Sequence, residues 1–215
     1  MIAGKGRGVV FDLDGVLIDS EPLHLRAYQA VLAGYGVSLT REDYYARYIV
    51  YPDREVLEQL LPDRRAVQAA MAAKQQRYLE LIGTGPPAFA DGLALLARMD
   101  GWRVALATGS RREEAELSLR ALGIRHRFQT VISWEDCLRG KPDPDPYLRA
   151  AEGLGLPAGR CVAVEDTPGG VRAAKAAGMR CVGVTHSCSR ERLREADLVV
   201  EDLAGLDLAG VLAGC

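Results

Sequence analysis

The chain has 215 residues, 48% of them hydrophobic, which is enough to bury a sizeable core, and we expect one domain that carries an insertion. Its 27 basic and 29 acidic residues are mixed, with no block of either sign, so we expect no nucleic-acid partner and no membrane contact held by charge. No segment approaches the length of a membrane span, and residues 1–8 lack the apolar stretch of a signal peptide.

The first predicted element is a buried strand at residues 9–11, an apolar run that is too short for a helix. Asp12 and Asp14 follow the strand, and Gly15 allows a sharp turn. Because alternate residues of extended chain point the same way, Asp12 and the backbone around Asp14 can face one small volume. Such a pair suits a hard cation, or a nucleophile with an acid/base partner, although a polar turn alone also explains it. A calcium loop is excluded because Val16 occupies its third ligand position.

Helical patterns then fill residues 17–87, which we interpret as an insertion after the first strand. Ser20 is the expected N-cap of a helix that runs to about residue 35, and further helices are expected from Thr40, from Asp53 and from Asp63. Residues 49–51 form the only strand-like run of this region. The turn residues at 83–87 make a plausible return hinge.

From residue 91 the pattern changes to helices that alternate with buried strands. A capping box of Ser110 and Glu113 is expected to begin one helix, and Asp145 to cap another. This alternation predicts a parallel sheet covered on both faces. The predicted strands occupy residues 103–107, 130–133, 161–164, 181–184 and 198–200.

Polar residues follow several of these strands, at the sheet edge where ligands of such folds bind. They are Asp12 and Asp14, Thr108, Lys141, and Glu165 with Asp166. Acids and a lysine together describe a site for a magnesium ion and a phosphoryl group.

At these residues the sequence resembles the haloacid dehalogenase-like hydrolases, and within them the phosphatases related to β-phosphoglucomutase. Residues 12–20 match the first motif of that family, 107–110 look like the second, 141–142 the third and 164–167 the fourth. The resemblance covers essentially the whole chain and implies a Rossmann-like parallel sheet core with a helical cap inserted after the first strand. The expected catalytic core is 1–16 with 88–215, and the expected cap is 17–87.

The resemblance also implies roles for the core residues. Asp12 would attack phosphorus to form an aspartyl-phosphate, and Asp14 would be the general acid/base. Thr108 would bind the transferring phosphoryl group, and Lys141 would stabilise the phosphate and the nucleophile. Ser110 either contacts the substrate or only caps its helix.

Mg²⁺ is the cofactor that the resemblance implies. Its ligands would be Asp12, the backbone carbonyl of Asp14, and Asp166, while Glu165 would either ligate directly or act through water. Four acids packed together would raise one another's pKa values, and a divalent cation would remove that penalty.

The cap offers three further residues. His24 matches a histidine that the mutases and many related phosphatases carry near the hinge, and Arg54 lies in a segment that resembles one where an arginine binds the distal part of the substrate. A solvent-facing position on a helix is the alternative for both. Glu80 stands where β-phosphoglucomutase has a lysine that holds the sugar phosphate, which favours a phosphatase over a mutase.

Three functions remain open at this point. The first is a Mg²⁺-dependent phosphatase of a small phosphorylated metabolite, such as a sugar phosphate. The second is a phosphoglucomutase, and the third is a catalytically idle phosphate-binding or regulatory protein. We expect a monomer. The five cysteines, Cys137, Cys161, Cys181, Cys188 and Cys215, are odd in number and show no Cys-x-x-Cys motif. Because Cys161 and Cys181 each open an apolar, strand-like run, we expect buried free thiols and a reducing cytoplasm.

Overall fold

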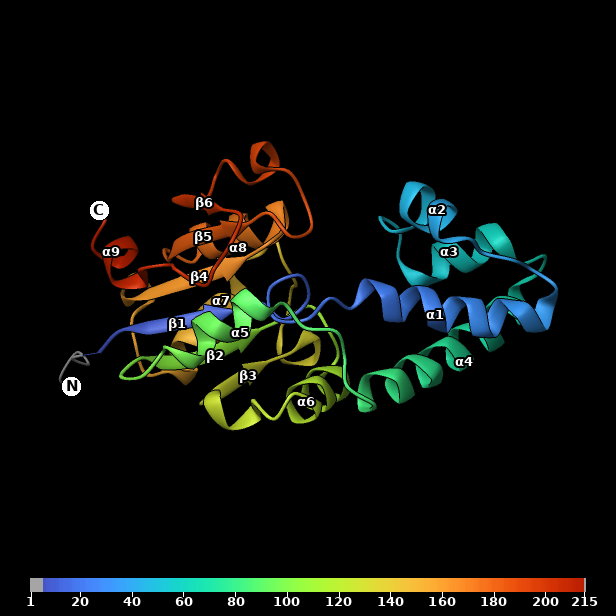
Figure 1. Cartoon of the computed structure of the whole chain (residues 1–215), viewed down its shortest axis with the longest axis horizontal. Coiled ribbons are helices and arrows are strands. Elements are labelled where there is room, and N and C mark those ends of the chain that lie inside the picture. Colours follow the sequence, from blue (N-terminus) through green and yellow to red (C-terminus); the bar gives the residue numbers. More distant parts are fainter. Residues whose placement is uncertain (1–5, 215) are drawn as a thin grey trace. The chain divides into compact units, whose positions relative to one another are not determined.

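The computed structural model describes residues 6–214, and its chain divides into two compact units (Figure 1). One unit comprises Met1–Asp19 with Pro87–Cys215, and the other comprises Ser20–Pro86. The sequence analysis expected the corresponding boundaries after residues 16 and 87. Each unit is described below by itself.

The first unit is built on a six-stranded parallel sheet with strand order β3-β2-β1-β4-β5-β6. Strand β1 lies in the middle, where Phe11 is opposite Leu106 on one side and Val164 on the other. Since all six strands run in parallel, their carboxyl ends meet at one edge. This confirms the predicted fold class. The strands are β1 (Gly8–Phe11), β2 (Arg103–Ala107), β3 (Thr130–Ile132), β4 (Cys161–Glu165), β5 (Arg180–Val184) and β6 (Leu198–Val200).

Helices cover both faces of this sheet. Val9 and Phe11 pack into a core with α5 (Ala90–Ala97), α6 (Arg112–Ala121) and α9 (Leu208–Ala213). Val10, which points the other way, packs with α7 (Asp145–Gly153) and α8 (Pro168–Ala176). Burial on both faces explains why the strands are apolar except at some of their end residues. Four 3₁₀ turns complete the unit: η3 (Arg125–Arg127), η4 (Trp134–Asp136), η5 (Ala158–Arg160) and η6 (Arg190–Leu193).

The second unit is helical, as the sequence predicted. The Thr40 hydroxyl caps its helix by accepting from the Asp43 backbone N–H, and the Asp63 carboxylate does the same for Ala66. An apolar core that includes Tyr28, Leu57 and Val67 joins the helices. The elements are α1 (Glu21–Leu32), η1 (Ala33–Tyr35), α2 (Arg41–Asp43), the π-helix η2 (Tyr44–Tyr48), α3 (Asp53–Leu60) and α4 (Arg64–Gly83).

One local prediction for this unit was wrong, and another is confirmed in its position but not in its hydrogen bond. Residues 49–51 do not form a strand, because η2 continues into a turn in which the Ile49 N–H donates to the Tyr44 carbonyl. The side chain of Val50 is consequently 77% exposed. Ser20 does precede α1, but its hydroxyl makes no capping hydrogen bond and the residue is buried. Pro22, in the first turn, has no N–H that would need a cap.

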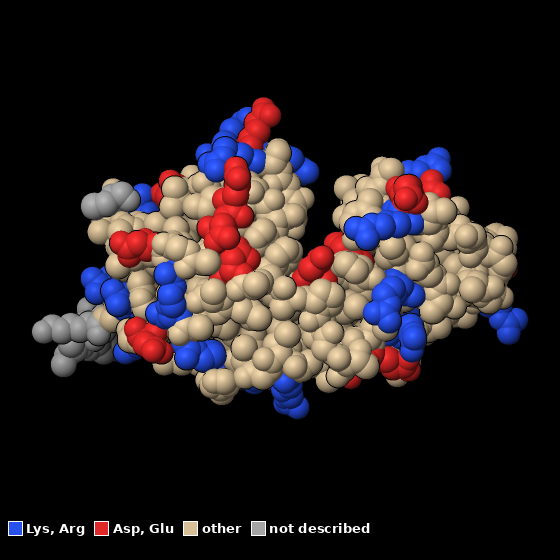
Figure 2. All heavy atoms as spheres, viewed as in Figure 1, with Lys and Arg blue, Asp and Glu red and all other residues tan. Residues whose placement is uncertain are grey.

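The surface carries both signs of charge without a large block of one sign on the face drawn in Figure 2. No helix among residues 6–214 combines the length and the apolar character that a membrane crossing requires. Cys137, Cys161, Cys181 and Cys188 are free thiols, whereas Cys215 lies outside the described residues.

Candidate active site

The site is organised by the turn that follows β1. The Asp12 N–H donates to the Val164 carbonyl at 3.0 Å and extends the pairing with β4 by one residue. The chain then leaves the sheet through Gly15, whose φ of 77° few other residues adopt. A Cβ on Gly15 would lie 1.8 Å from an Asp166 carboxylate oxygen. The glycine therefore lets this turn pack directly against the acid that follows β4.

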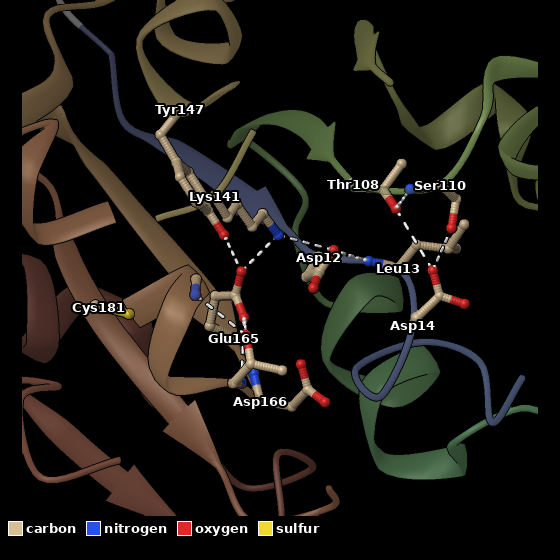
Figure 3. A network of polar contacts seen from close by, with 12 residues as sticks. Asp12, Leu13, Asp14, Thr108, Ser110, Lys141, Tyr147, Glu165, Asp166 and Cys181 are labelled. Atoms are coloured by element: carbon tan, nitrogen blue, oxygen red, sulfur yellow. Dashed lines mark hydrogen bonds and ion pairs between the residues drawn. The ribbon is translucent and has the colours of Figure 1, made fainter. Parts of the chain in front are cut away.

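Lys141 connects the nucleophile candidate to the end of β4. Its ammonium lies 3.0 Å from Oδ1 of Asp12 and 2.5 Å from Oε1 of Glu165 (Figure 3). Asp12 is 7% exposed and Glu165 is fully buried. The structure therefore brings together Asp12, which follows β1, Lys141, which lies in the loop after β3, and Glu165, the last residue of β4.

Glu165 has little capacity left for a further partner. Oε1 accepts from Lys141 and from the hydroxyl of Tyr147 at 2.6 Å. Oε2 accepts from the N–H of Asp166 and from both the N–H and the hydroxyl of Thr167. These five donors match or exceed the roughly four lone-pair sites of a carboxylate. Glu165 is thus held as an anchor for Lys141.

Asp166 differs from its neighbour in this respect. Its Oδ1 is the one buried side-chain oxygen or nitrogen, among the residues that the structure describes, that has no hydrogen-bond partner. Oxygens from Asp12, Glu165 and Asp166 all lie within 4.8 Å of one another. A buried, unpartnered carboxylate oxygen inside an acidic cluster is the environment that a hard divalent cation would satisfy. The residues present therefore fit the predicted metal.

Asp14 is held by the loop that follows β2. The Ser110 hydroxyl donates to Oδ2 of Asp14 at 2.5 Å, and the Thr108 hydroxyl lies 3.5 Å from the same oxygen. The predicted capping box of Ser110 and Glu113 is wrong, because α6 begins after Arg111, whose N–H donates to the Glu114 carboxylate. The Ser110 hydroxyl is instead directed toward the acid/base candidate.

Burial and mutual repulsion govern the electrostatics of the cluster. Burial raises the pKa of Asp12 well above its usual range; Lys141 opposes this rise, and Glu165 and Asp166 add to it. Burial and the Glu165 charge also raise the pKa of Asp166 to about 7. For Lys141 burial acts to lower the pKa, but Asp12 and Glu165 outweigh it, so the pKa lies above its ordinary value. The protein thus keeps a fixed cation among acids that would otherwise resist ionisation.

The three cap candidates lie in the second unit. Nδ1 of His24 accepts a hydrogen bond from the buried ammonium of Lys74 at 2.8 Å, and the His24 ring stacks on Tyr78. Arg54 is half exposed and lies 3.8 Å from Glu58 on the same helix. Glu80 is exposed and pairs with Arg77 at 2.9 Å. The roles of His24 and Arg54 toward a substrate stay predictions.

Sequence reasoning missed two residues that support the site and the cap. Tyr147 is fully buried and contacts Glu165, and Lys74 is 1% exposed at the centre of a polar cluster in the second unit. A tyrosine at a core-facing position of α7 gives no sign in the sequence that its hydroxyl meets a strand end. The four motifs, in contrast, were visible because they follow strands.

Comparisons with known proteins agree with the fold and the family resemblance. The family model for the haloacid dehalogenase-like hydrolases matches residues 7–178. A protein of Thermotoga maritima named phosphorylated carbohydrates phosphatase is 34% identical over 187 residues, which cover 83% of this chain and 85% of that protein. β-Phosphoglucomutase of Bacillus subtilis is 31% identical over 212 residues, which cover 94% of this chain and 92% of the enzyme.

A solved structure extends the likeness to three dimensions. A mutant of CbbY from Rhodobacter sphaeroides in complex with xylulose-(1,5)bisphosphate has a TM-score of 0.79 and 29% identity, and the match covers 95% of this chain and 98% of that one. The chain also spans about a fifth of the length of a longer Arabidopsis thaliana protein, SUPPRESSOR OF QUENCHING 1, chloroplastic, to which it is 30% identical (21% of that protein).

The parallel α/β fold and these comparisons together define the chain as a hydrolase. The chain belongs to the haloacid dehalogenase-like hydrolase family. This confirms the predicted resemblance and the prediction that the chain is an enzyme, a phosphatase of this family.

Proposed function

We propose that this chain is a Mg²⁺-dependent phosphatase that hydrolyses a small phosphorylated carbohydrate through an aspartyl-phosphate on Asp12. The observation that carries the proposal is the placement of the buried Asp12 carboxylate, 3.0 Å from the Lys141 ammonium and beside the unpartnered oxygen of Asp166. A carboxylate in this position has a cation to offset the charge of an incoming phosphate. The idle alternative finds no support here, because each motif residue is present and engaged.

The proposed reaction has two steps. First, an Asp12 carboxylate oxygen bonds to phosphorus while the bond from phosphorus to the ester oxygen breaks, and Asp14 gives that oxygen a proton. Then water attacks the phosphorus of the aspartyl-phosphate, Asp14 accepts a proton from this water, and inorganic phosphate leaves with Asp12 regenerated. The Ser110 hydroxyl, 2.5 Å from Asp14, would keep that carboxyl directed into the site.

Asp12, the Asp14 backbone carbonyl and Asp166 would hold the metal. The hydrogen bonds that Glu165 accepts favour an anchoring role for this residue over direct ligation. When bound, a divalent cation neutralises the acidic cluster and screens the phosphate as the nucleophile approaches. Thr108, which is 2% exposed, would contact the transferring phosphoryl group through its hydroxyl.

The relatives support the substrate class. One is named a phosphatase of phosphorylated carbohydrates, and another was solved with a sugar bisphosphate. We expect the substrate to be a sugar phosphate of the cytoplasm. The free thiols of the described chain fit that reducing compartment. The relative named β-phosphoglucomutase keeps a mutase as the second candidate.

The test is a screen of phosphorylated metabolites with Mg²⁺, in which release of inorganic phosphate is measured. We expect turnover of at least one sugar phosphate and of p-nitrophenyl phosphate. The control is Asp12→Asn, in which an amide cannot form an aspartyl-phosphate, so rates should fall by several orders of magnitude while the circular dichroism spectrum is kept. If this variant retains even a tenth of the activity, the nucleophile has been assigned wrongly.

A further inference from the structure

His186 contacts the turn behind the acid/base candidate, although it belongs to none of the four motifs. It follows β5, and its side chain is 11% exposed. Nδ1 lies 2.9 Å from the backbone carbonyl oxygen of Gly15, and Nε2 lies 3.1 Å from Oδ2 of Asp91. The imidazole also stacks on the ring of Phe89, with 4.0 Å between the ring centroids and an angle of 8° between the planes.

The chemistry of the two partners fixes the direction of both hydrogen bonds. A backbone carbonyl oxygen can only accept, so Nδ1 must donate to Gly15. An ionised carboxylate also only accepts, so Nε2 must donate to Asp91. Both bonds are therefore made together only when both ring nitrogens carry a hydrogen. Asp91 is itself fixed, because Oδ2 accepts from the Leu203 N–H at 2.9 Å.

His186 connects two segments that lie far apart in the sequence, the turn at Gly15 and the start of α5 at Asp91. Gly15 directly follows Asp14, and Asp91 lies at the start of α5, on the segment by which the chain returns to the first unit. That segment is paired with the outgoing one, since the Phe89 N–H donates to the Leu17 carbonyl at 3.0 Å. His186 thus fastens the Asp14 turn to the base of the return segment.

The Asp14 turn is also supported from within, because the N–H groups of Val16, Leu17 and Ile18 all donate to the Leu13 carbonyl. The contact with His186 comes from another element, the loop after β5. The Gly15 N–H donates to the Ile18 carbonyl within the same loop, and the absent Cβ of Gly15 leaves its backbone in contact range of Asp166. The Gly15 carbonyl belongs to the rigid peptide plane that joins Gly15 to Val16, so His186 holds the backbone immediately after Asp14. Small displacements of a proton donor reduce its catalytic contribution steeply.

We propose that His186 is a positioning residue of the phosphatase: by donating to the Gly15 carbonyl it holds Asp14 where it can protonate the leaving oxygen. The inference rests on the proposed function, since it requires Asp14 to be the general acid. It assigns a role in the reaction to a residue from the loop after β5, outside the four motifs.

The test compares two substrates that differ in their need for a proton. p-Nitrophenolate leaves without protonation, whereas the leaving oxygen of phenyl phosphate depends more on an acid. The parameter is kcat/KM, which reports the transfer of the phosphoryl group to Asp12. In His186→Phe, which keeps a ring against Phe89 but removes both hydrogen bonds, we expect kcat/KM for phenyl phosphate to fall about tenfold more than for p-nitrophenyl phosphate.

Two further variants make the test specific. In His186→Asn the side-chain amide can take the place of Nδ1–H toward Gly15 without reaching Asp91, so the ratio of the two kcat/KM values should stay close to that of the wild type. His126→Phe makes the same change at an exposed histidine on η3 and should alter neither substrate. Thermal unfolding of each variant checks that the fold is kept.

The outcomes separate the inference from the proposed function. Equal losses for the two substrates in His186→Phe, or an Asn variant that behaves like the Phe variant, would overturn the positioning role. Asp14→Asn should show a still larger preference for p-nitrophenyl phosphate. If it shows none, Asp14 is not the general acid, and the proposed acid role and this inference fall together. If Asp14→Asn shows the preference and His186→Phe does not, only the inference is lost.

Discussion

Lys74 in the second unit offers a sharp test of the energetics inferred from the structure. Its side chain is 1% exposed, and its ammonium lies 2.7 and 2.8 Å from the two oxygens of Asp53 and 2.8 Å from Nδ1 of His24. The rings of Tyr28 and Tyr78 flank it at 4.9 and 5.2 Å. Asp53→Asn removes the carboxylate and leaves a cation buried among neutral groups.

The expected loss follows from the burial of each partner. Removal of one member of a buried ion pair costs about 3–5 kcal/mol, because the remaining charge stays desolvated. The Asp53 side chain is 39% exposed, so water can hydrate the lysine in part, and the Asn oxygen still accepts one hydrogen bond. We therefore expect the free energy of unfolding to fall by about 2 kcal/mol.

The pH dependence has a defined sign. Burial acts to raise the pKa of Asp53, but Lys74 outweighs it, so the folded-state pKa lies below that of free aspartate. A carboxyl with a lowered pKa stabilises the fold above its unfolded-state pKa, and this contribution is lost as the pH falls through the folded-state value. The difference between wild type and Asp53→Asn should consequently persist at neutral pH and shrink on acidification below about pH 4.

Urea unfolding followed by circular dichroism measures the effect, and about 2 kcal/mol corresponds to a midpoint lower by about 1 M. Glu58→Gln is the matched control on the same helix: it breaks the exposed pair with Arg54 and should cost less than about 0.5 kcal/mol. Adding Lys74→Met to Asp53→Asn should restore most of the loss, because no buried charge then remains. A midpoint for Asp53→Asn within error of the Glu58→Gln value would refute the reasoning.

Three other predictions concern the catalytic unit. Asp166→Ala should weaken the apparent affinity for Mg²⁺ strongly, because one anionic ligand disappears; an unchanged Mg²⁺ titration of activity would move this role to another residue. Tyr147→Phe should lower the free energy of unfolding by about 1–3 kcal/mol, since it removes a buried hydrogen bond to the Glu165 carboxylate, and urea midpoints equal to wild type would contradict this. With β-glucose 1-phosphate, Mg²⁺ and a catalytic amount of the bisphosphate, phosphorus NMR should show inorganic phosphate; rapid formation of glucose 6-phosphate without it would establish a mutase.

The structure changes the reasoning behind the last of these predictions. A glutamate in place of the mutase lysine would repel a second phosphate if its charge were unopposed, but the Glu80 carboxylate is exposed and paired with Arg77, so its field is largely compensated. What remains of the argument is the absence of a lysine at that position. The phosphatase expectation therefore rests on the missing cation and no longer on an added anion.

The sequence predicted the sheet and the strand-end residues well, because both depend on local patterns. Apolar runs fix the strands, and parallel strands bring their carboxyl ends to one edge, so Asp12, Lys141 and Asp166 had to lie near one another. The predicted Ser110 capping box was wrong because it rested on a local pattern alone. A serine before a helix satisfies the local pattern, but contact with Asp14, which lies 96 residues away, determines where its hydroxyl points.

The residues that the sequence analysis missed make contacts between segments that lie far apart in the chain. Tyr147 reaches Glu165 from α7, and His186 reaches Gly15 across 171 residues. Neither residue follows a pattern that separates it from an ordinary core tyrosine or a loop histidine. The strand predicted at residues 49–51 was wrong for another reason. Their β-branched and aromatic composition favours a strand, but the helical unit contains no strand with which they could pair.

The clearest gain from the structure is the division of roles between Glu165 and Asp166. Both are buried acids at the end of β4, and the family resemblance named Asp166 as a ligand but left direct ligation by Glu165 open. Glu165 is the last residue of the strand and faces α7 and α8, where Gly170 leaves room for its carboxylate and Tyr147, Lys141 and Thr167 donate to it. Asp166 begins the loop beyond the strand and keeps one buried oxygen without a partner. Because an unmet acceptor is costly to bury, this unpartnered oxygen supports the ligand role that we propose for Asp166.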